Sequence, residues 1–172
     1  MYHRILVAVD NSELSQRAFH KALSIARAFS AKLQIINVVS PLIAEYQDTA
    51  SLAFSESFLP DTLPDTLNET TREEWVSIRD GGLNLLRSLQ QQAERAGVKA
   101  EMTQQIGQID EGITEFAKSW HADLIVIGSH GRKGFTELLF GSVSNYVSHH
   151  VSCSVLLVHQ EAELSAEQFI EE

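Results

Sequence analysis

Residues 123–131 read DLIVIGSHG, and the group Phe140-Gly141-Ser142 follows soon after. The apolar run from Leu124 to Ile127 stops abruptly at a glycine, which is typical of a buried parallel strand that opens into a loop at its carboxyl end. Ligands bind at this end of the strands in open α/β sheets. This part of the chain therefore predicts a parallel sheet with a ligand site at its edge.

The segment after Gly141 has apolar residues at helical spacing, namely Val143, Tyr146 and Val147. The first N–H groups of a helix are unpaired and the helix dipole is positive there, so together with the Ser142 hydroxyl they suit a phosphate. Glycines also let the backbone approach a ligand closely. We therefore expect a nucleotide, although a strand-to-helix loop requires glycine for its turn even without a ligand.

Apolar runs alternate with segments of helical period along the rest of the chain, and this order predicts βαβ units. We expect strands at 5–9, 33–39, 98–103, 124–127 and 154–158. The first helix, capped by Ser12, is expected to bury Leu14, Ala18, Ala22, Ile25 and Phe29. The second is expected to bury Trp75, Ile78, Leu85, Leu86, Leu89 and Ala93 and to end near Gly97. The third, capped by Asp110, carries Ile113, Phe116, Ala117 and Trp120.

Two adjacent glycines weaken the long second helix. Gly81 and Gly82 each cost about 1 kcal/mol relative to alanine in a helix interior. The sequence therefore predicts that this helix is either kinked at the pair or begins only after it.

The glycine pattern is G-x2-G-x9-G-S, formed by Gly128, Gly131, Gly141 and Ser142. In this spacing, directly after an apolar strand, it resembles the ATP-binding signature of the universal stress protein family. Residues 4–13 and the closing strand at 154–158 are also similar to that family. The resemblance fails only across the middle, from about residue 41 to residue 80.

The resemblance implies one Rossmann-like α/β domain over residues 1–160, with an irregular insertion at about 41–70 and an acidic tail at 161–172. It also implies a five-stranded parallel sheet of order 3-2-1-4-5 with helices on both faces. That order puts the first and fourth strands side by side, with the topological switch point at their carboxyl ends. Asp10 and Gly128 both stand there.

The resemblance further assigns nucleotide contacts to individual residues. Asp10 approaches the adenine and ribose, Val38 offers backbone contacts to the adenine, and Gly128 with Gly131 wraps the ribose and first phosphate. By the same resemblance, Gly141, Ser142 and Val143 bind the phosphates. Taken alone, an aspartate in the position of Asp10 is more commonly a cap for backbone N–H groups at a turn or helix start.

The net charge of -10 and the pI near 5.1 argue against attraction to nucleic acid or to anionic lipid. The same charge disfavours bound ATP, so the site requires local compensation. We expect it from Arg132 and Lys133, from helix N–H groups, and from Mg²⁺ or Mn²⁺ shared with the phosphates. No set of His, Cys and Asp has metal-ligand spacing, so we expect no metal site made by the protein alone.

No apolar run approaches the length that spans a bilayer. The first strand begins almost at once, so we expect no leader segment and a cytoplasmic protein without membrane insertion. The single cysteine, Cys153, is expected to be a buried thiol without a disulfide. No serine or cysteine has a placed base, so we expect a protein that is not an enzyme, with at most slow ATP hydrolysis.

Two functions follow. The first is an ATP-binding universal stress protein that acts as a dimeric regulatory module, paired through the last strand, Val155–Val158, and read by a client such as a transporter or a regulator. The alternative is a partner-binding protein of the same fold, with an empty site or another nucleotide, that contacts its clients through the 41–70 insertion.

Overall fold

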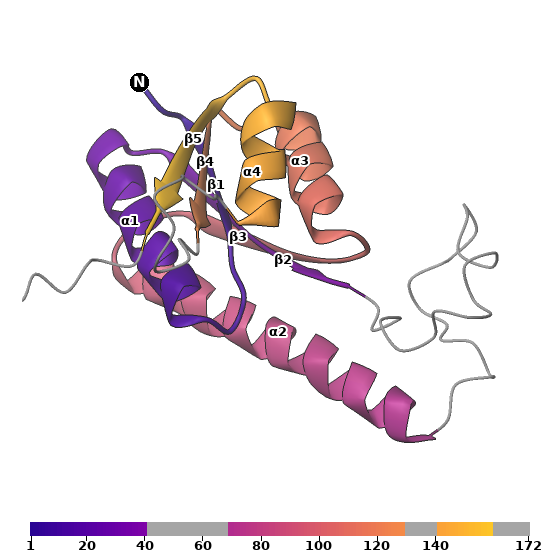
Figure 1. Cartoon of the computed structure of the whole chain (residues 1–172). Coiled ribbons are helices and arrows are strands. Elements are labelled where there is room, and N and C mark those ends of the chain that lie inside the picture. The colour runs from indigo at the N-terminus through magenta and orange to yellow at the C-terminus, as the bar shows by residue number, and fades with distance from the viewer. Residues whose placement is uncertain (41–68, 130–140, 160–172) are drawn as a thin grey trace, which may run out of the picture.

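The computed structural model describes residues 1–40, 69–129 and 141–159, and of residues 69–72 the backbone only. The described strands are β1 (Arg4–Ala8), β2 (Lys32–Val39), β3 (Ala100–Ile106), β4 (Leu124–Gly128) and β5 (Ser154–Val158). The described helices are α1 (Glu13–Phe29), α2 (Glu69–Arg95), α3 (Ile109–Trp120) and α4 (Ser142–His150). All strand pairs are parallel and their order is β3-β2-β1-β4-β5, as predicted (Figure 1).

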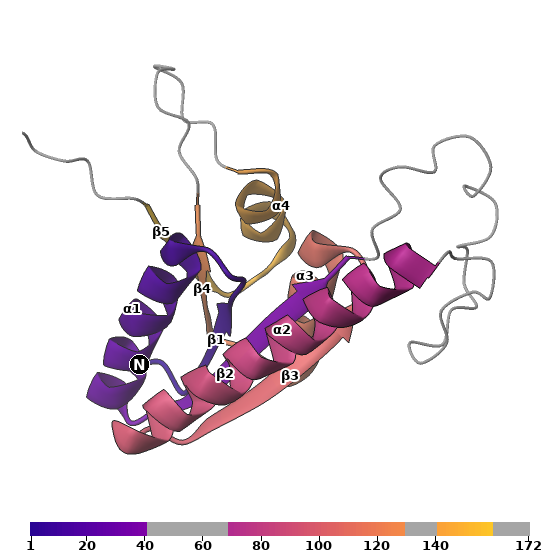
Figure 2. The same cartoon turned by 90° about the horizontal axis from the view of Figure 1, so that it is seen from below.

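The sheet has a pair of helices on each face (Figures 1 and 2). Side chains of a strand alternate between the faces. On the central strand, Ile5 and Val7 face the core made with α1 and α2, whereas Leu6 and Ala8 face the core made with α3 and α4. The predicted α/β fold with helices on both faces is confirmed.

The ends of α1 are fixed locally. Ser12 caps its first turn as predicted, because the Ser12 Oγ accepts a hydrogen bond from the Ser15 N–H at 3.1 Å. The sequence predicted that Phe29 is buried, but this side chain is 40% exposed, so the prediction is wrong. Its ring packs edge-on against Tyr2, with 5.6 Å between ring centroids, in place of a contact with the sheet.

α2 runs without interruption through Gly81 and Gly82, so the prediction that it begins after them is wrong (Figure 2). Ile78 was also predicted to be buried and is 40% exposed. At 3.6 residues per turn it lies about 60° around the helix from the buried Trp75, at the margin of the apolar stripe. The helix ends as predicted near Gly97, which has a φ of 77°.

β3 begins at Ala100 and not at Val98, because Val98 is part of the turn after α2. Its N–H donates to the Ala93 carbonyl at 2.9 Å, which closes a Schellman turn around Gly97. β3 lies at one edge of the sheet, where the sequence placed it, and continues to Ile106.

Asp110 does not cap α3. The capping position belongs to Gln108, whose carbonyl accepts the Gly112 N–H at 2.9 Å, and the helix begins at Ile109. Gly107, with a φ of 150°, turns the chain from β3 directly into this helix and so starts it two residues early. Asp110 lies in the first turn, where its charge favours the helix dipole.

The predicted helix after Gly141 is confirmed as α4, and Gly141 is its capping residue. His149 and His150 lie in the last turn of α4, where a basic side chain suits the negative end of the helix dipole. The predicted insertion at 41–70 lies outside the described residues up to residue 68, and so does the predicted tail at 161–172. Among the described helices, none is long and apolar enough to cross a bilayer.

Candidate functional site

A hollow opens at the carboxyl ends of β1, β2 and β4 and at the first turn of α4. Six of the eight predicted site residues line it: Asp10, Val38, Gly128, Gly141, Ser142 and Val143. The parallel topology brings them together, because β1 lies between β2 and β4 and all three strands end at the same edge. The other two, Gly131 and Arg132, lie outside the described residues.

Asp10 follows β1 and is exposed at the mouth of the hollow. Its Oδ1 accepts a hydrogen bond from the Ser12 N–H at 2.9 Å and another from the Ser12 hydroxyl. The Asp10 N–H donates to the Ser15 Oγ at 2.8 Å. The carboxylate thus caps a turn through one oxygen, while Oδ2 makes no hydrogen bond to any described residue. One oxygen fixes the side chain, and the other is left available at the mouth of the hollow.

Gly128 has a packing role that needs no ligand. A Cβ added there would lie 3.0 Å from the Leu14 Cγ, in the first turn of α1, so the helix approaches the strand at the distance that a glycine allows. Leu14 is itself buried and lines the hollow. The sequence interpretation had given such a glycine a turn or a ligand as its reason, and this packing contact is a third.

The N-terminus of α4 forms one wall of the hollow. Gly141 carries no side chain to cap the helix, so the first N–H groups lack a side-chain acceptor there. Ser142 is exposed, and its hydroxyl stands beside these groups. Unpaired N–H groups at the positive end of a helix dipole attract an anion.

A buried pair of hydroxyls holds this wall against β4. Ser129 follows β4 and Ser144 lies in the first turn of α4, with 1% and 2% of their surfaces exposed. Their Oγ atoms are 3.2 Å apart, and the Ser144 Oγ donates to the Gly141 carbonyl at 3.0 Å. A hydroxyl has one proton, so the consistent arrangement has Ser129 donating to Ser144. The pair joins the two ends of the segment that connects β4 to α4.

The remaining walls are apolar. Ile36 and Val38 on β2, Ile127 on β4 and Ile113 on α3 contribute side chains that suit a flat aromatic ring. Among the described residues that line the hollow, Asp10 alone carries a charged side chain. No three His, Cys, Asp or Glu residues of the described segments gather as metal ligands. A divalent cation here would therefore depend on oxygens supplied by the ligand.

The Cys153 thiol lies elsewhere, in a second depression beside Lys118 and His121. Burial raises the pKa of the Cys153 thiol, and the negative charge of Asp123 raises it further. Such a thiol is mostly protonated at neutral pH and a poor nucleophile. It takes no part in the hollow described above.

The whole arrangement matches one known family, since the model of the universal stress protein family covers residues 1–159. The chain belongs to the universal stress protein family. Universal stress protein Sll1388 from Synechocystis sp. is 34% identical over 157 residues, which are 91% of this chain and 97% of that protein. The solved structure of universal stress protein UspA from Lactobacillus plantarum aligns with a TM-score of 0.69 at 26% identity, covering 91% of this chain and 97% of that one.

Two further universal stress protein structures contain an adenine nucleotide. One is a complex with cAMP, with a TM-score of 0.61 and 24% identity, covering 93% of this chain and 99% of that one. The other, from Arabidopsis thaliana, has AMP bound, with a TM-score of 0.62 and 21% identity, covering 96% of this chain and 97% of that one. At these identities the likeness shows a shared fold.

Several residues of the universal stress protein hollow were missed from the sequence. Ser12 and Ser15 fix Asp10, and Ser129 with Ser144 fixes the start of α4. Serines are common in helix starts and loops, so a serine by itself gives no signal of this role. Ser12 was predicted only as a helix cap, and Ser129 and Ser144 are distinguished only by their contact with each other. The sequence indicated part of the apolar lining, because Ile36 and Val38 are two residues apart on β2 and therefore lie on the same face of the sheet.

Proposed function

We propose that this universal stress protein binds ATP in the hollow at the ends of β1, β2 and β4 and acts as a dimeric regulatory module. The observation that carries the proposal is that Asp10 and the N-terminus of α4 line one hollow with apolar walls. A carboxylate oxygen, an apolar slot and a row of unpaired N–H groups together match the ribose, the base and the phosphates of a nucleotide.

Each part of the ligand has a partner in this proposal. The Asp10 Oδ2 accepts hydrogen bonds from the ribose hydroxyls, and the backbone of Val38 contacts the adenine. The N–H groups of Ser142 and Val143 hold the phosphates with the Ser142 hydroxyl. Mg²⁺ or Mn²⁺ binds through the phosphate oxygens. The cation and Arg132 together offset the negative charge of the phosphates.

We propose a binding module and not an enzyme. Hydrolysis of ATP requires a group that orients or deprotonates the attacking water. Asp10 is placed for the ribose, and the other described residues that line the hollow offer hydroxyls and apolar groups. We therefore expect at most slow hydrolysis, with the nucleotide state read by a client such as a transporter or regulator in the cytoplasm.

The proposed dimer uses the free edge of β5. β5 pairs with β4 on one side, and the Ser154 N–H and the Val158 carbonyl point to that side. By alternation, the backbone groups of Val155 and Leu157 face the open edge. An unpaired edge is a template for another strand, and a second copy of β5 would satisfy it about a two-fold axis.

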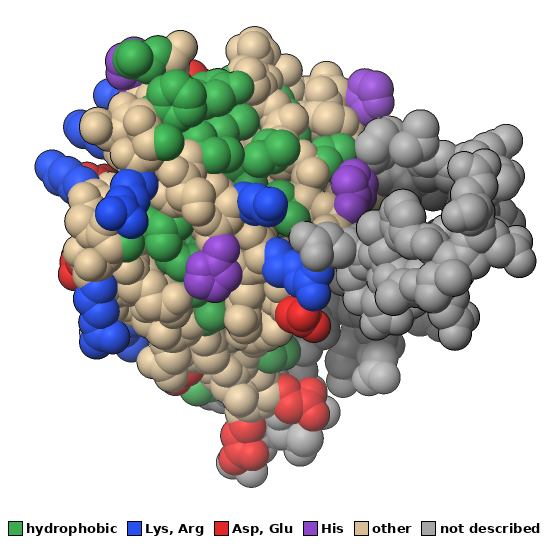
Figure 3. All heavy atoms as spheres, turned by 90° about the vertical axis from the view of Figure 1, so that its left-hand side faces the viewer, with side chains coloured by type: hydrophobic (Ala, Val, Ile, Leu, Met, Phe, Trp, Pro, Cys, Tyr) green, Lys and Arg blue, Asp and Glu red, His purple; other side chains and the backbone are tan. Residues whose placement is uncertain are grey.

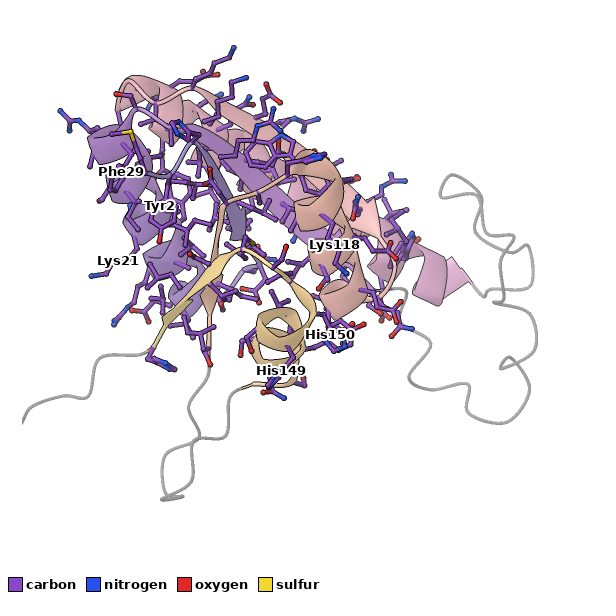
Figure 4. The ribbon with its side chains drawn as sticks, turned by 90° about the horizontal axis from the view of Figure 1, so that it is seen from above. Tyr2, Lys21, Phe29, Lys118, His149 and His150 are labelled. Carbon is purple, nitrogen blue, oxygen red and sulfur yellow. The ribbon has the colours of Figure 1, made fainter. Side chains whose placement is uncertain are left out.

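The surroundings of this edge suit a partner. Figure 3 shows the side of the molecule that carries α1, where hydrophobic side chains gather beside Lys and Arg side chains. In Figure 4, Tyr2, Lys21 and Phe29 lie on the α1 side of β5, and Lys118, His149 and His150 lie with the helices of the other face. These groups flank a shared β5–β5 interface without blocking it.

Native mass spectrometry of the protein with ATP and Mg²⁺ tests the proposal. We expect a dimer with one nucleotide per chain, and a monomer that still binds ATP for Val155→Pro, since proline removes an outward N–H from an edge strand and Val155 does not line the hollow. A protein that stays bare at millimolar ATP rules out nucleotide binding. A dimer in Val155→Pro rules out the β5 interface.

Another adenine nucleotide is the second candidate ligand, because the relatives described above hold cAMP and AMP. Competition among ATP, AMP and cAMP for the hollow distinguishes the candidates. If the α4 N-terminus holds the β- and γ-phosphates, ATP binds more tightly than AMP in the presence of Mg²⁺. Equal affinities place only one phosphate in the site and favour the alternative.

A further inference from the structure

A chain of hydrogen-bonded amides runs from α2 to the end of β1. The side chain of Asn37, on β2, is 5% exposed. Its Nδ2 donates to the Val9 carbonyl at 2.8 Å, and its Oδ1 accepts from the Gln104 Nε2 at 3.0 Å. The same Gln104 nitrogen donates to the Arg79 carbonyl on α2 at 2.9 Å. The chain thus ends on the peptide that leads into Asp10.

Asn37 stands where an apolar residue would serve packing. Its neighbours on the same face of β2, Leu33 and Ile35, are fully buried in the core with α1 and α2. The amide is tolerated because both of its ends have partners, and a buried amide without them is costly. Its distinctive contribution is the bond to the Val9 carbonyl, which lies just beyond β1 and outside the strand ladder.

Gly82 makes room for this chain. A Cβ at Gly82 would overlap the Asn37 Oδ1 and would lie 2.5 Å from the Gln104 Nε2. A Cβ at the adjacent Gly81 would meet nothing within 4 Å. The close approach of α2 to the amides therefore depends on one of the two glycines.

The outer end of the chain reaches a second hollow. Arg79 and Gln104 line it, together with Gln105, Glu111 and Val38. Val38 also lines the hollow that holds Asp10. Gln104 lines this second hollow and Val9 lines the hollow of Asp10, so the amide chain joins one lining residue of each.

We propose that Asn37 and Gln104 are positioning residues that fix the direction of the Val9–Asp10 peptide, so that the packing of α2 sets the orientation of the Asp10 carboxylate. That Asp10 binds a nucleotide rests on the proposed function, whereas the positioning of Asp10 by the two amides does not depend on it. Neither amide lines the hollow of Asp10, so both act on a ligand only through their neighbours.

A matched control lies on the same strand. Gln34 is also a buried amide of β2, 2% exposed, and its Nε2 donates to the Thr103 Oγ1 on β3 at 3.1 Å. It differs from Asn37 in having no bond to the end of β1. Asn37→Leu and Gln34→Leu therefore both remove a β2 amide that bonds a β3 side chain, but only the first releases Asp10.

The test measures two properties of each variant. Backbone amide exchange by NMR reports on Asp10 and Ser12 without a ligand, and calorimetric titration with ATP and Mg²⁺ reports affinity. For Asn37→Leu we expect faster exchange at both backbone amides and about tenfold weaker binding of ATP. A change of this size corresponds to the net contribution of about one hydrogen bond. For Gln34→Leu we expect both properties to stay within about twofold of the unchanged protein.

A double-mutant cycle separates positioning from a general loss of stability. In an Asp10→Ala background, Asn37→Leu should weaken ATP binding by less than about twofold, because the group it positions is gone. An undiminished effect in that background overturns the proposal. Where Asn37→Leu does not fold, Gln104→Leu breaks the same chain at its half-buried end.

The two proposals fail in different ways. If the unchanged protein binds no nucleotide, the proposed function is wrong, and amide exchange alone decides the positioning. Exchange at Asp10 and Ser12 that is the same in Asn37→Leu and Gln34→Leu overturns the positioning. If ATP binds equally to both variants while exchange differs between them, Asp10 is positioned by Asn37 but does not contact the ligand, and the coupling to the site is rejected.

Discussion

The hydroxyls of Ser129 and Ser144 lie 3.2 Å apart in the interior of the protein, one at the end of β4 and the other in the first turn of α4. The bond joins the two ends of the glycine-signature segment, although 15 residues of chain separate them. The bond that ties the N-terminus of α4 to the end of β4 is therefore made by side chains that the signature does not specify.

Removing this bond should affect both stability and phosphate binding. In Ser144→Ala the Ser129 hydroxyl stays buried without a partner, which costs about 1–3 kcal/mol of unfolding free energy. We expect this loss in urea unfolding, with weaker binding of ATP. Ser148→Ala is the control, because Ser148 is exposed on the same helix and also bonds a carbonyl three residues back. An equal effect of the two substitutions contradicts the role of the pair.

Asp10→Asn should distinguish the roles of the two carboxylate oxygens. Asparagine keeps a carbonyl oxygen for the Ser12 N–H, so we expect the fold and its melting temperature to change little. The negative charge and the second acceptor are lost, so adenosine should bind about tenfold more weakly. Inorganic triphosphate should bind equally well or better, because a like charge has left the hollow. Calorimetric titration with the two ligands decides, and unchanged adenosine binding places Asp10 outside the site.

The glycines of α2 should respond in opposite directions to alanine. Gly81→Ala gains helix propensity in open space and should raise the unfolding free energy by about 0.5–1 kcal/mol. Gly82→Ala gains the same propensity but forces the Asn37 and Gln104 amides apart, so overpacking should leave a net loss of about 1–3 kcal/mol. Parallel urea titrations measure both. A stabilising Gly82→Ala would show that α2 can withdraw from the sheet without cost.

Cys153 should react slowly in the folded protein. The pKa of this thiol is raised, mainly by burial and in addition by the negative charge of Asp123. Less thiolate is therefore present at a given pH. We expect iodoacetamide at pH 8 to modify the folded protein several-fold more slowly than the urea-unfolded chain. Because the native pKa is raised, the stabilisation from this thiol is full below its unfolded pKa and falls as pH rises through the native value. Equal alkylation rates in the two states would contradict the burial.

The sequence predicted the sheet well because β1, β4 and β5 are short, mainly apolar runs and β2 is a longer one, whereas β3 carries more polar residues. Parallel topology then brings residues such as Asp10 and Gly141 to one edge, which is why six predicted residues line one hollow. The strand order came from the family resemblance, since apolar runs alone do not reveal which strands are neighbours.

Predictions from single residues failed where a neighbouring turn or a distant contact decided the outcome. Asp110 has the side chain of a capping residue, but the turn at Gly107 starts α3 before it. Gly82 was read as a weakness of the helix, yet it is the point where α2 meets Asn37. The second outcome depends on two residues far apart in the chain, which a one-dimensional pattern does not contain, whereas the first depends on a nearby backbone turn.

The contact between Gly128 and Leu14 has a consequence for how relatives are compared. In a chain of this fold with a leucine at that place in α1, a larger residue at the end of β4 requires the leucine or its helix to shift, whatever the chain binds. Such a chain could lose its nucleotide through changes at the helix that follows and still retain the first glycine of the pattern. The first glycine of the pattern therefore reports how closely α1 packs on β4, and by itself it does not report a ligand.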